Sequence, residues 1–246
     1  MKKAVKYIVT ALIWLGIWQV LSMIANLEML LPSPAGTVKA LISTARTEYF
    51  WMSIFYTLIR IAVGFILGCV IGILPGFITF FSKNAQTFFS PLLHIIKATP
   101  VASFIILALV WMKSTFVPSF ISALIVIPFV WSNVNTGLKS ADPLLLEASR
   151  AFAVPMKKQL KNIYFPAVKP YLLSAFSTAA GLAWKAGVAA EVICYPPYSI
   201  GKGIYNSKIY LETPELFAWT ATVIILSVGL EKLILFITKR TGAKKE

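Results

Sequence analysis

Six long apolar blocks dominate this sequence and limit what it can fold into. They cover about residues 7–25, 52–81, 92–111, 116–138, 164–194 and 216–237, and the third is interrupted near Pro100. A helix needs about 20 mostly apolar residues to cross the hydrocarbon core of a bilayer. Only 13% of the residues are charged, whereas a soluble domain carries about 25%. The pattern predicts an all-α integral membrane protein with about six transmembrane helices, in a single domain over residues 1–246.

The charge of the chain indicates how these helices are oriented. The net charge is +14, and Lys and Arg gather at both chain ends and between residues 139 and 169. Basic residues are retained on the cytoplasmic side of membrane proteins. Both termini are therefore expected inside (N-in/C-in), with the loop at about 140–165 in the cytoplasm beside the membrane lipid. Because no basic patch is interleaved with aromatic residues, nucleic acid is not an expected partner.

The loop at about 140–165 is predicted to begin with a short helix. Asp142 is a suitable N-cap, and Pro143 suits the first helical turn. Pro155 ends this helix, because the residue before a proline is pushed out of the α region. Apolar residues recur at helical spacing and form one face, which comprises Leu144, Leu145, Ala148, Ala151 and Phe152.

A second short helix is predicted over residues 156–165, and Pro166 marks a turn into the fifth apolar block. Its basic face carries Lys157, Lys158 and Lys161. The pattern fits two roles. The helix pair lies on the lipid surface as an amphipathic element, or it docks a cytoplasmic protein.

Four glycines recur every fourth residue in the second block: Gly64, Gly68, Gly72 and Gly76. A stripe of small residues lets another helix approach closely. We therefore expect a helix-packing face, either against the chain's own bundle or against a second copy.

Three charged residues within the apolar blocks are candidates for the translocation pathway: Lys185, Glu191 and Arg60. Charges inside a membrane are costly and mark functional positions. Lys185 is deepest and is the preferred candidate, especially for an anionic substrate. Glu191 lies near the outer end of its block and Arg60 is close enough to an end to snorkel outward, so structural roles remain open for all three.

Enzyme chemistry is not expected of this chain. His94 is the only histidine, and no Ser/His/Asp set or cysteine–histidine metal spacing occurs. No G-x-x-x-x-G-K-[ST] motif for ATP is present either. We therefore expect no bound cofactor and no metal site.

The 140–165 loop resembles the cytoplasmic EAA loop of bacterial ABC-importer permeases, whose pattern is E-A-A-x3-G-x9-I-x-L-P. The matching positions are Glu147, Ala148, Ile163 and Pro166. Ser149 replaces the second alanine, Ala153 the glycine and Phe165 the leucine. The change at Ala153 matters because a turn at positive φ suits glycine better than alanine.

Further stretches carry the resemblance over nearly the whole chain: "LLPSPAGTVKAL", "TLIRIAVGFILGCVIGILPG", "PLLHIIKATPVASFIILALVWM", "WKAGVAAEVI" and "YLETPELFAW". They resemble the nitrate/sulfonate/taurine branch of these permeases. The resemblance implies a type I importer fold with six spans in the bacterial cytoplasmic (inner) membrane. It also implies a small solute as cargo, either an anion of this kind or a vitamin precursor.

The resemblance implies partners as well. A second permease copy completes a dimeric pathway, most simply as a homodimer, and an extracytoplasmic binding protein delivers the substrate. Two cytoplasmic ATPase subunits use ATP and Mg and receive the EAA loop as a coupling helix. Leu145 and Phe152 would then be apolar anchors, and Glu147 and Arg150 polar partners. The alternative is an ion-coupled secondary transporter or channel. Such proteins bury carboxylates in mid-span, whereas here only Glu191 and Glu231 approach a span, both near its end.

Overall fold

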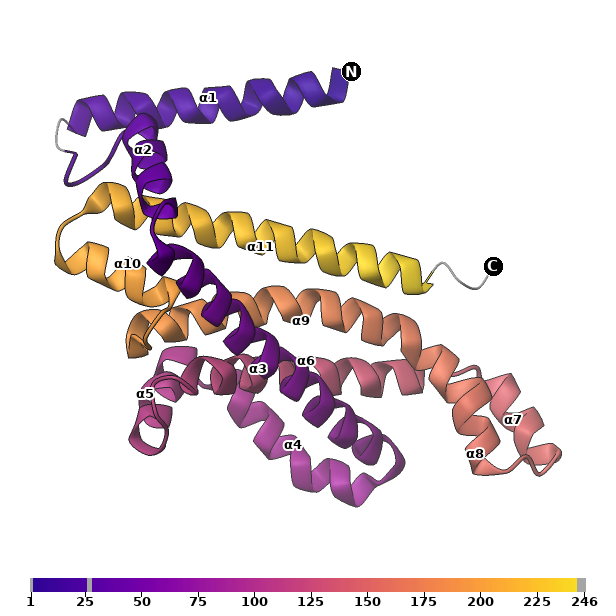
Figure 1. The fold of residues 1–246 in the computed structure, drawn as a ribbon. Coiled ribbons are helices and arrows are strands. Elements are labelled where there is room, and N and C mark those ends of the chain that lie inside the picture. Colours follow the sequence, from indigo (N-terminus) through magenta and orange to yellow (C-terminus); the bar gives the residue numbers. More distant parts are fainter. Residues whose placement is uncertain (1, 26–27, 243–246) are drawn as a thin grey trace. The chain divides into compact units, whose positions relative to one another are not determined.

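The described part of the chain consists of helices joined by short links and contains no strand. It is known from a computed structural model that describes residues 2–25 and 28–242, and the side chains of residues 5–6, 8–25 and 28–236. Lys244 and Lys245 of the basic C-terminal tail lie outside the described residues. The helices, in chain order (Figure 1), are α1 (Lys2–Ala25), α2 (Pro34–Ala45), α3 (Glu48–Phe81), α4 (Lys83–Ala98), α5 (Val101–Trp111), α6 (Val117–Lys139), α7 (Pro143–Ala151), α8 (Met156–Gln159), the π-helical turn η1 (Leu160–Tyr164), α9 (Phe165–Cys194), α10 (Ile200–Ile209) and α11 (Thr213–Gly242).

Four of the described helices are long and apolar enough to cross a membrane on their own, namely α1, α3, α6 and α11. Helices α4 and α5 meet the same test as a pair, bent by 105° at their junction. This bend confirms the interruption predicted near Pro100, which precedes the first residue of α5. The segments between the first and second and between the fifth and sixth apolar blocks also hold short helices, α2 and α10, which the apolar pattern did not indicate.

Helix α9 has 30 residues and is long enough to span, but its most apolar stretch is less apolar than those of α1, α3, α6 and α11, and it is not among the candidate spans. It carries Lys169, Lys185 and Glu191, and its buried face is built from small residues, Ala175, Ala179, Ala183, Gly187 and Ala190 among them. A helix that packs on protein does not need the long aliphatic side chains that lipid selects. The fifth predicted span therefore exists as a helix of sufficient length whose environment is mainly protein.

The chain divides into two compact units. Unit 1 comprises Met1–Thr57 and Tyr195–Leu226, and unit 2 comprises Leu58–Cys194 and Ser227–Glu246. Helices α3 and α11 contribute to both.

Unit 2 is built on the antiparallel helices α6 and α9, which lie side by side (Figure 1). Of the apolar segment of α6, 56% is buried, against 6% of that of α1. One buried cluster joins α5 to the start of α6 and the end of α9. It contains Ile105 of α5, Val117 and Ile121 of α6, and Ala190 and Cys194 of α9. The α6–α9 pair therefore forms the buried core of this unit.

The glycine stripe of α3 lies against α6 within the same unit. An added β-carbon on Gly68 would meet Val126 Cβ at 2.7 Å, and one on Gly76 would meet Val134 Cβ at 2.8 Å. Gly64 and Gly72 face the backbone of Ser119 and Ile127 in the same way. Such approaches leave no room for a methyl group, so the stripe brings the α3 and α6 backbones together.

Unit 1 is organised around Trp219 of α11. Gly203 of α10 lies against the Trp219 ring, where a β-carbon would approach to 2.5 Å. The rings of Tyr49 and Phe50 contact Trp219 with centroids 6.3 and 5.1 Å away. Aromatic contacts of this kind stabilise beyond their buried area, and here they tie the start of α3 to α10 and α11.

Candidate functional site

The 140–165 loop begins with the helix that the sequence predicts. The Leu144 backbone N–H donates to Asp142 Oδ1 at 2.9 Å, and Pro143 occupies the first helical position. The cap satisfies one of the N–H groups that every helix start leaves without a partner. Helix α7 therefore starts at a fixed point directly after the end of α6.

Helix α7 ends in a left-handed turn centred on Ala153. The Ala153 N–H donates to Arg150 O at 3.0 Å, and the Val154 N–H donates to Ser149 O at 2.8 Å. These two bonds define a Schellman motif, and Ala153 has a φ of 47°. The chain therefore makes this turn with alanine in the glycine position of the EAA pattern, at the cost of strain at one residue.

The apolar face of α7 has no partner among the described residues. Phe152 is 83% exposed, Leu144 73% and Leu145 53%. Ser149 is buried instead, and its hydroxyl donates to Leu146 O at 2.8 Å. Large exposed apolar side chains gathered on one short helix mark a surface that another molecule covers.

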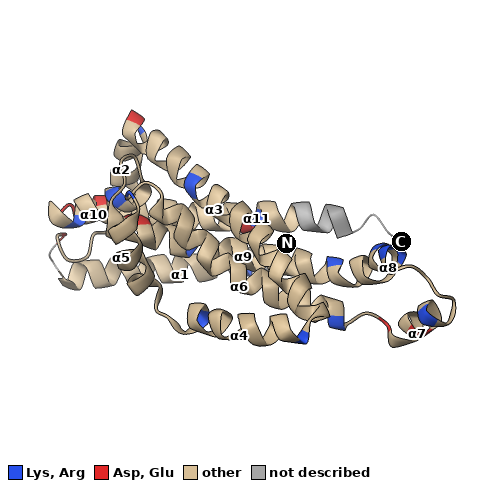
Figure 2. Cartoon of the chain, turned by 90° about the horizontal axis from the view of Figure 1, so that it is seen from below, with Lys and Arg blue, Asp and Glu red and all other residues tan. Residues whose placement is uncertain are grey.

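Polar residues surround this apolar face. Glu147 and Arg150 are exposed on α7, as is Ala148 of the apolar face, and Lys157 and Lys158 are exposed on α8. Figure 2 marks the basic positions of both helices in blue, whereas the long helix α6 carries no charged residue before Lys139 at its end. The loop thus presents apolar, acidic and basic groups within a short distance along the chain.

The second half of the loop differs from the prediction. A separate helix over residues 156–165 with a turn at Pro166 was expected, but α8 passes through η1 into α9 without a break. In η1 the Phe165 N–H donates to Leu160 O, five residues earlier. A wider turn fits the missing N–H and the ring of Pro166, which would otherwise clash with the preceding turn. The prediction of a turn here was wrong, because a π turn accommodates the proline.

The loop is also fixed to unit 2 by packing. Tyr164 is buried, and its ring contacts Phe80 and Phe81 at the end of α3 with centroids 5.8 and 5.5 Å away. Gln159 Nε2 donates to Val154 O at 2.8 Å, which ties α8 to the turn after α7. Ile163 is half-buried beside Tyr164, while Pro166 is exposed. The exposed α7 face therefore stands on a rigid base.

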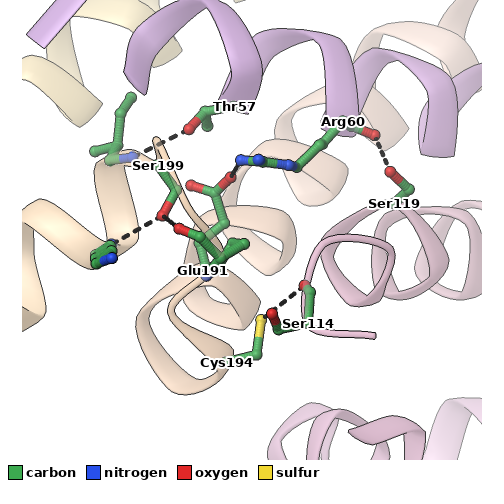
Figure 3. Close-up of polar contacts among 10 residues, drawn as sticks. Thr57, Arg60, Ser114, Ser119, Glu191, Cys194 and Ser199 are labelled. Atoms are coloured by element: carbon green, nitrogen blue, oxygen red, sulfur yellow. Dashed lines mark hydrogen bonds and ion pairs between the residues drawn. The ribbon is translucent and has the colours of Figure 1, made fainter. Parts of the chain in front are cut away.

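Two of the three charged pathway candidates form a buried ion pair. Arg60 Nη1 of α3 lies 3.2 Å from Glu191 Oε1 of α9, and the two side chains point toward each other (Figure 3). Glu191 is fully buried and Arg60 is 8% exposed. Arg60 therefore does not snorkel outward, and Glu191 is enclosed by protein although it lies near the outer end of its apolar block. Each charge is compensated by the other inside the protein.

The surroundings of the pair hold the three core helices together. Ser119 Oγ of α6 donates to Arg60 O at 2.8 Å, and Ser122 Oγ of α6 donates to Ala183 O of α9 at 3.2 Å. Lys185, the preferred pathway candidate, is exposed on another face of α9. Lys185 is thus apart from the other two, and a pathway role for it remains a prediction.

Comparison with known proteins identifies the family. Residues 64–240, more than half of the chain, match the family model described as the binding-protein-dependent transport system inner membrane component. The chain belongs to this family. Its fold agrees, because a histidine-bound amino acid ABC transporter chain superposes with a TM-score of 0.69 and 16% identity, over 81% of this chain and 97% of that one. A methionine ABC transporter chain in an inward-facing conformation superposes with a TM-score of 0.65 and 18% sequence identity, over 79% of this chain and 97% of that one.

Curated relatives are permeases of the same kind. A probable ABC transporter permease from Brucella melitensis is 26% identical over 89% of both chains. A nitrate import permease from Synechococcus elongatus is 28% identical over 78% of this chain and 73% of its own. A putative aliphatic sulfonates transport permease from Bacillus subtilis is 24% identical over 83% of this chain and 74% of its own. The protein is therefore a multi-pass membrane permease of an ABC importer, a transport subunit whose ATP hydrolysis belongs to a separate subunit.

Proposed function

We propose that this permease imports a small oxyanion and that α7 docks on the ATPase subunit that powers it. Two copies of the chain would form the pathway, two ATPase subunits would bind on the α7 side, and a binding protein would deliver the anion. The observation that supports ATPase docking best is the unpartnered apolar face of α7 on a rigid base, with Phe152 83% exposed.

The geometry explains how a force on α7 would reach the membrane helices. Helix α7 follows α6 after a three-residue link, and α8 runs into α9 through η1 without a break. Tyr164 joins this base to the end of α3. Because α6 and α9 pack along their length, a displacement of α7 would move them as a pair rather than bend one of them. Closure of an ATPase dimer would then reorient the pathway.

The cargo class rests on the relatives and on charge. The relatives are described as permeases for nitrate, for aliphatic sulfonates and for bicarbonate. All three substrates are small oxygen-rich anions. The chain itself carries a net charge of +14, which favours anions near its surface.

The docking role is tested by placing a charge on the exposed apolar face. Phe152→Asp is expected to abolish copurification of the ATPase and ATP-driven uptake, because a desolvated carboxylate would oppose docking in an apolar groove. The melting temperature of the permease alone should not fall, since the Phe152 side chain packs on nothing. Leu30→Asp is the control, because Leu30 is likewise a strongly exposed apolar residue but lies outside the α7 loop. This variant should leave copurification intact.

The result that would contradict docking is undiminished copurification and uptake by the Phe152→Asp variant. The cargo class is tested separately, by uptake into proteoliposomes that contain the ATPase and the binding protein. Competition among nitrate, methanesulfonate and bicarbonate identifies the anion. Uptake of an uncharged pyrimidine but of none of these anions would contradict the oxyanion class.

A further inference from the structure

A polar pocket of about 220 Å³ lies between α4 and α6 in unit 2. Its polar lining comes from the end of α3, from α4 and from the second half of α6: Thr79, Gln86, Ser90, Ser132, Asn135, Thr136 and Lys139. The pocket lies at the end of α6 that leads into the α7 loop. Its lining residue Lys139 comes three residues before Asp142, the N-cap of α7. No sequence motif pointed to it.

The floor of the pocket is held in place by a buried hydroxyl. Thr79 Oγ1 accepts hydrogen bonds from Trp131 Nε1 at 2.9 Å and from Asn135 Nδ2 at 3.3 Å, and donates to Pro75 O at 2.6 Å. The ring of Phe89 on α4 packs on Trp131 with centroids 6.0 Å apart. Asn135 therefore has one amide hydrogen engaged and a fixed orientation, and its second N–H remains to donate to a ligand.

The electrostatic character of the pocket is positive. Lys139 forms no ion pair within the part of the chain that the structure describes. The sequence has no Asp or Glu between residues 49 and 141, the region that supplies every lining residue, and Lys139 is the charged residue of the lining. A recess lined by one sign of charge between low-dielectric walls concentrates ions of the opposite sign.

We propose that this pocket is a binding site for a small oxyanion, with Lys139 as its cation and Asn135, Ser132 and Gln86 as neutral hydrogen-bond donors. Hydroxyl and amide groups satisfy several oxygens at once, and one ammonium compensates a single negative charge. This set of groups offers no carboxylate to a cation, and Leu93 and Trp131 form the apolar part of the lining. The inference rests on the proposed function in one respect, namely that the transported solute is the physiological occupant.

The site would hold the anion beside the coupling element. Lys139 is the last residue of α6, and α7 begins at Pro143. Gln86 and Ser90 belong to α4, which carries no buried residue and contacts α6. A shift of α6 relative to α4 would thus separate Lys139 from the α4 donors and release the anion. The pocket is in this sense a waypoint whose affinity depends on the position of α6.

The test is a titration of the purified full-length permease in phosphatidylcholine nanodiscs with methanesulfonate, which replaces gluconate at constant ionic strength. Trp131 lines the pocket, so a saturable change in tryptophan fluorescence is expected, and Trp131→Phe should remove it. Lys139→Gln and Asn135→Ala are each expected to weaken methanesulfonate at least about fivefold, because each removes a hydrogen bond to a charged group. Lys97→Gln removes an exposed lysine of α4 outside the pocket and should change the affinity less than about twofold.

The outcomes separate the site from its alternatives. Equal affinity in the Lys139→Gln, Asn135→Ala and Lys97→Gln variants, with melting temperatures unchanged, would overturn the proposal. A fluorescence response to added phosphatidylglycerol but not to methanesulfonate would assign the pocket to lipid phosphate and would also overturn it. ATP-driven uptake without a Trp131-dependent response would refute the pocket and leave the proposed function intact. A response without uptake of any anion would refute the proposed cargo and support the pocket.

Discussion

At the scale of single residues, position 153 shows how a fold tolerates an unfavourable residue. The EAA pattern has glycine there, and the sequence raised the question whether alanine keeps the turn. The structure has Ala153 at a φ of 47° with both Schellman hydrogen bonds made. The two bonds and the fixed base of the loop outweigh a local strain of about 1–2 kcal/mol.

Ala153→Gly is therefore expected to stabilise the permease. Glycine removes a steric strain of about 1–2 kcal/mol, of which its greater freedom in the unfolded chain offsets about 0.5–1 kcal/mol, so a net gain of about 1 kcal/mol is expected. The melting temperature in detergent should rise by about 2–4 °C. Ala148→Gly, in the middle of the exposed face of α7, is the matched control and should lower it, because glycine is a poor helix former. A lower melting temperature for Ala153→Gly would contradict the strained turn.

At the scale of elements, the packing of α3, α6 and α9 depends on small residues and one ion pair. Glycines on α3 and small residues on α9 bring the backbones close, and the Arg60–Glu191 pair joins α3 to α9. The α9 stripe is visible in the sequence as a four-residue repeat of Ala175, Ala179, Ala183 and Gly187, a signal that sequence reasoning used for α3 and overlooked for α9. The pairing of Arg60 with Glu191 is not readable in this way, because 131 residues separate them.

Removal of one member of this pair is expected to be costly, and removal of both much less so. Glu191→Met leaves a buried guanidinium without its carboxylate and should destabilise by about 3–5 kcal/mol. The Arg60→Met/Glu191→Met double variant replaces the pair by apolar groups of similar length and should recover most of that loss. Unfolding by denaturant titration in micelles measures both. Lys185→Met, at an exposed residue of α9, should change stability by less than about 0.5 kcal/mol. Equal losses of unfolding free energy in Glu191→Met and Lys185→Met would show that the ion pair does not stabilise the fold.

At the scale of the whole molecule, orientation in the membrane remains a prediction from charge. Basic residues concentrate at the end of α6 and on α7 and α8, whereas the loop before α6 carries only Lys113. Lys113 precedes α6 and Asn162 follows it after α7 and α8, so the two positions flank a single spanning helix. They must therefore lie on opposite sides of the bilayer, and the charge distribution places Asn162 inside.

Cysteine labelling of intact cells tests this orientation. In a background with alanine at the native positions Cys69 and Cys194, which are both buried, a membrane-impermeant maleimide should label Lys113→Cys and spare Asn162→Cys. Inverted vesicles should give the opposite result. Labelling of Asn162→Cys in intact cells would place the α7 face outside, where no ATPase could reach it.

The sequence by itself determined the class of this protein, the order of its long apolar helices, the interruption near Pro100 and the start of α7. These features depend on local hydrophobicity, capping and proline geometry, which are properties of neighbouring residues. Only the tertiary structure decided that Arg60 meets Glu191, that α8 continues into α9, and that Thr79, Asn135 and Lys139 line one pocket. Such contacts depend on how helices remote in sequence pack together, and hydrophobic pattern alone fixes which residues avoid water but not which of them meet.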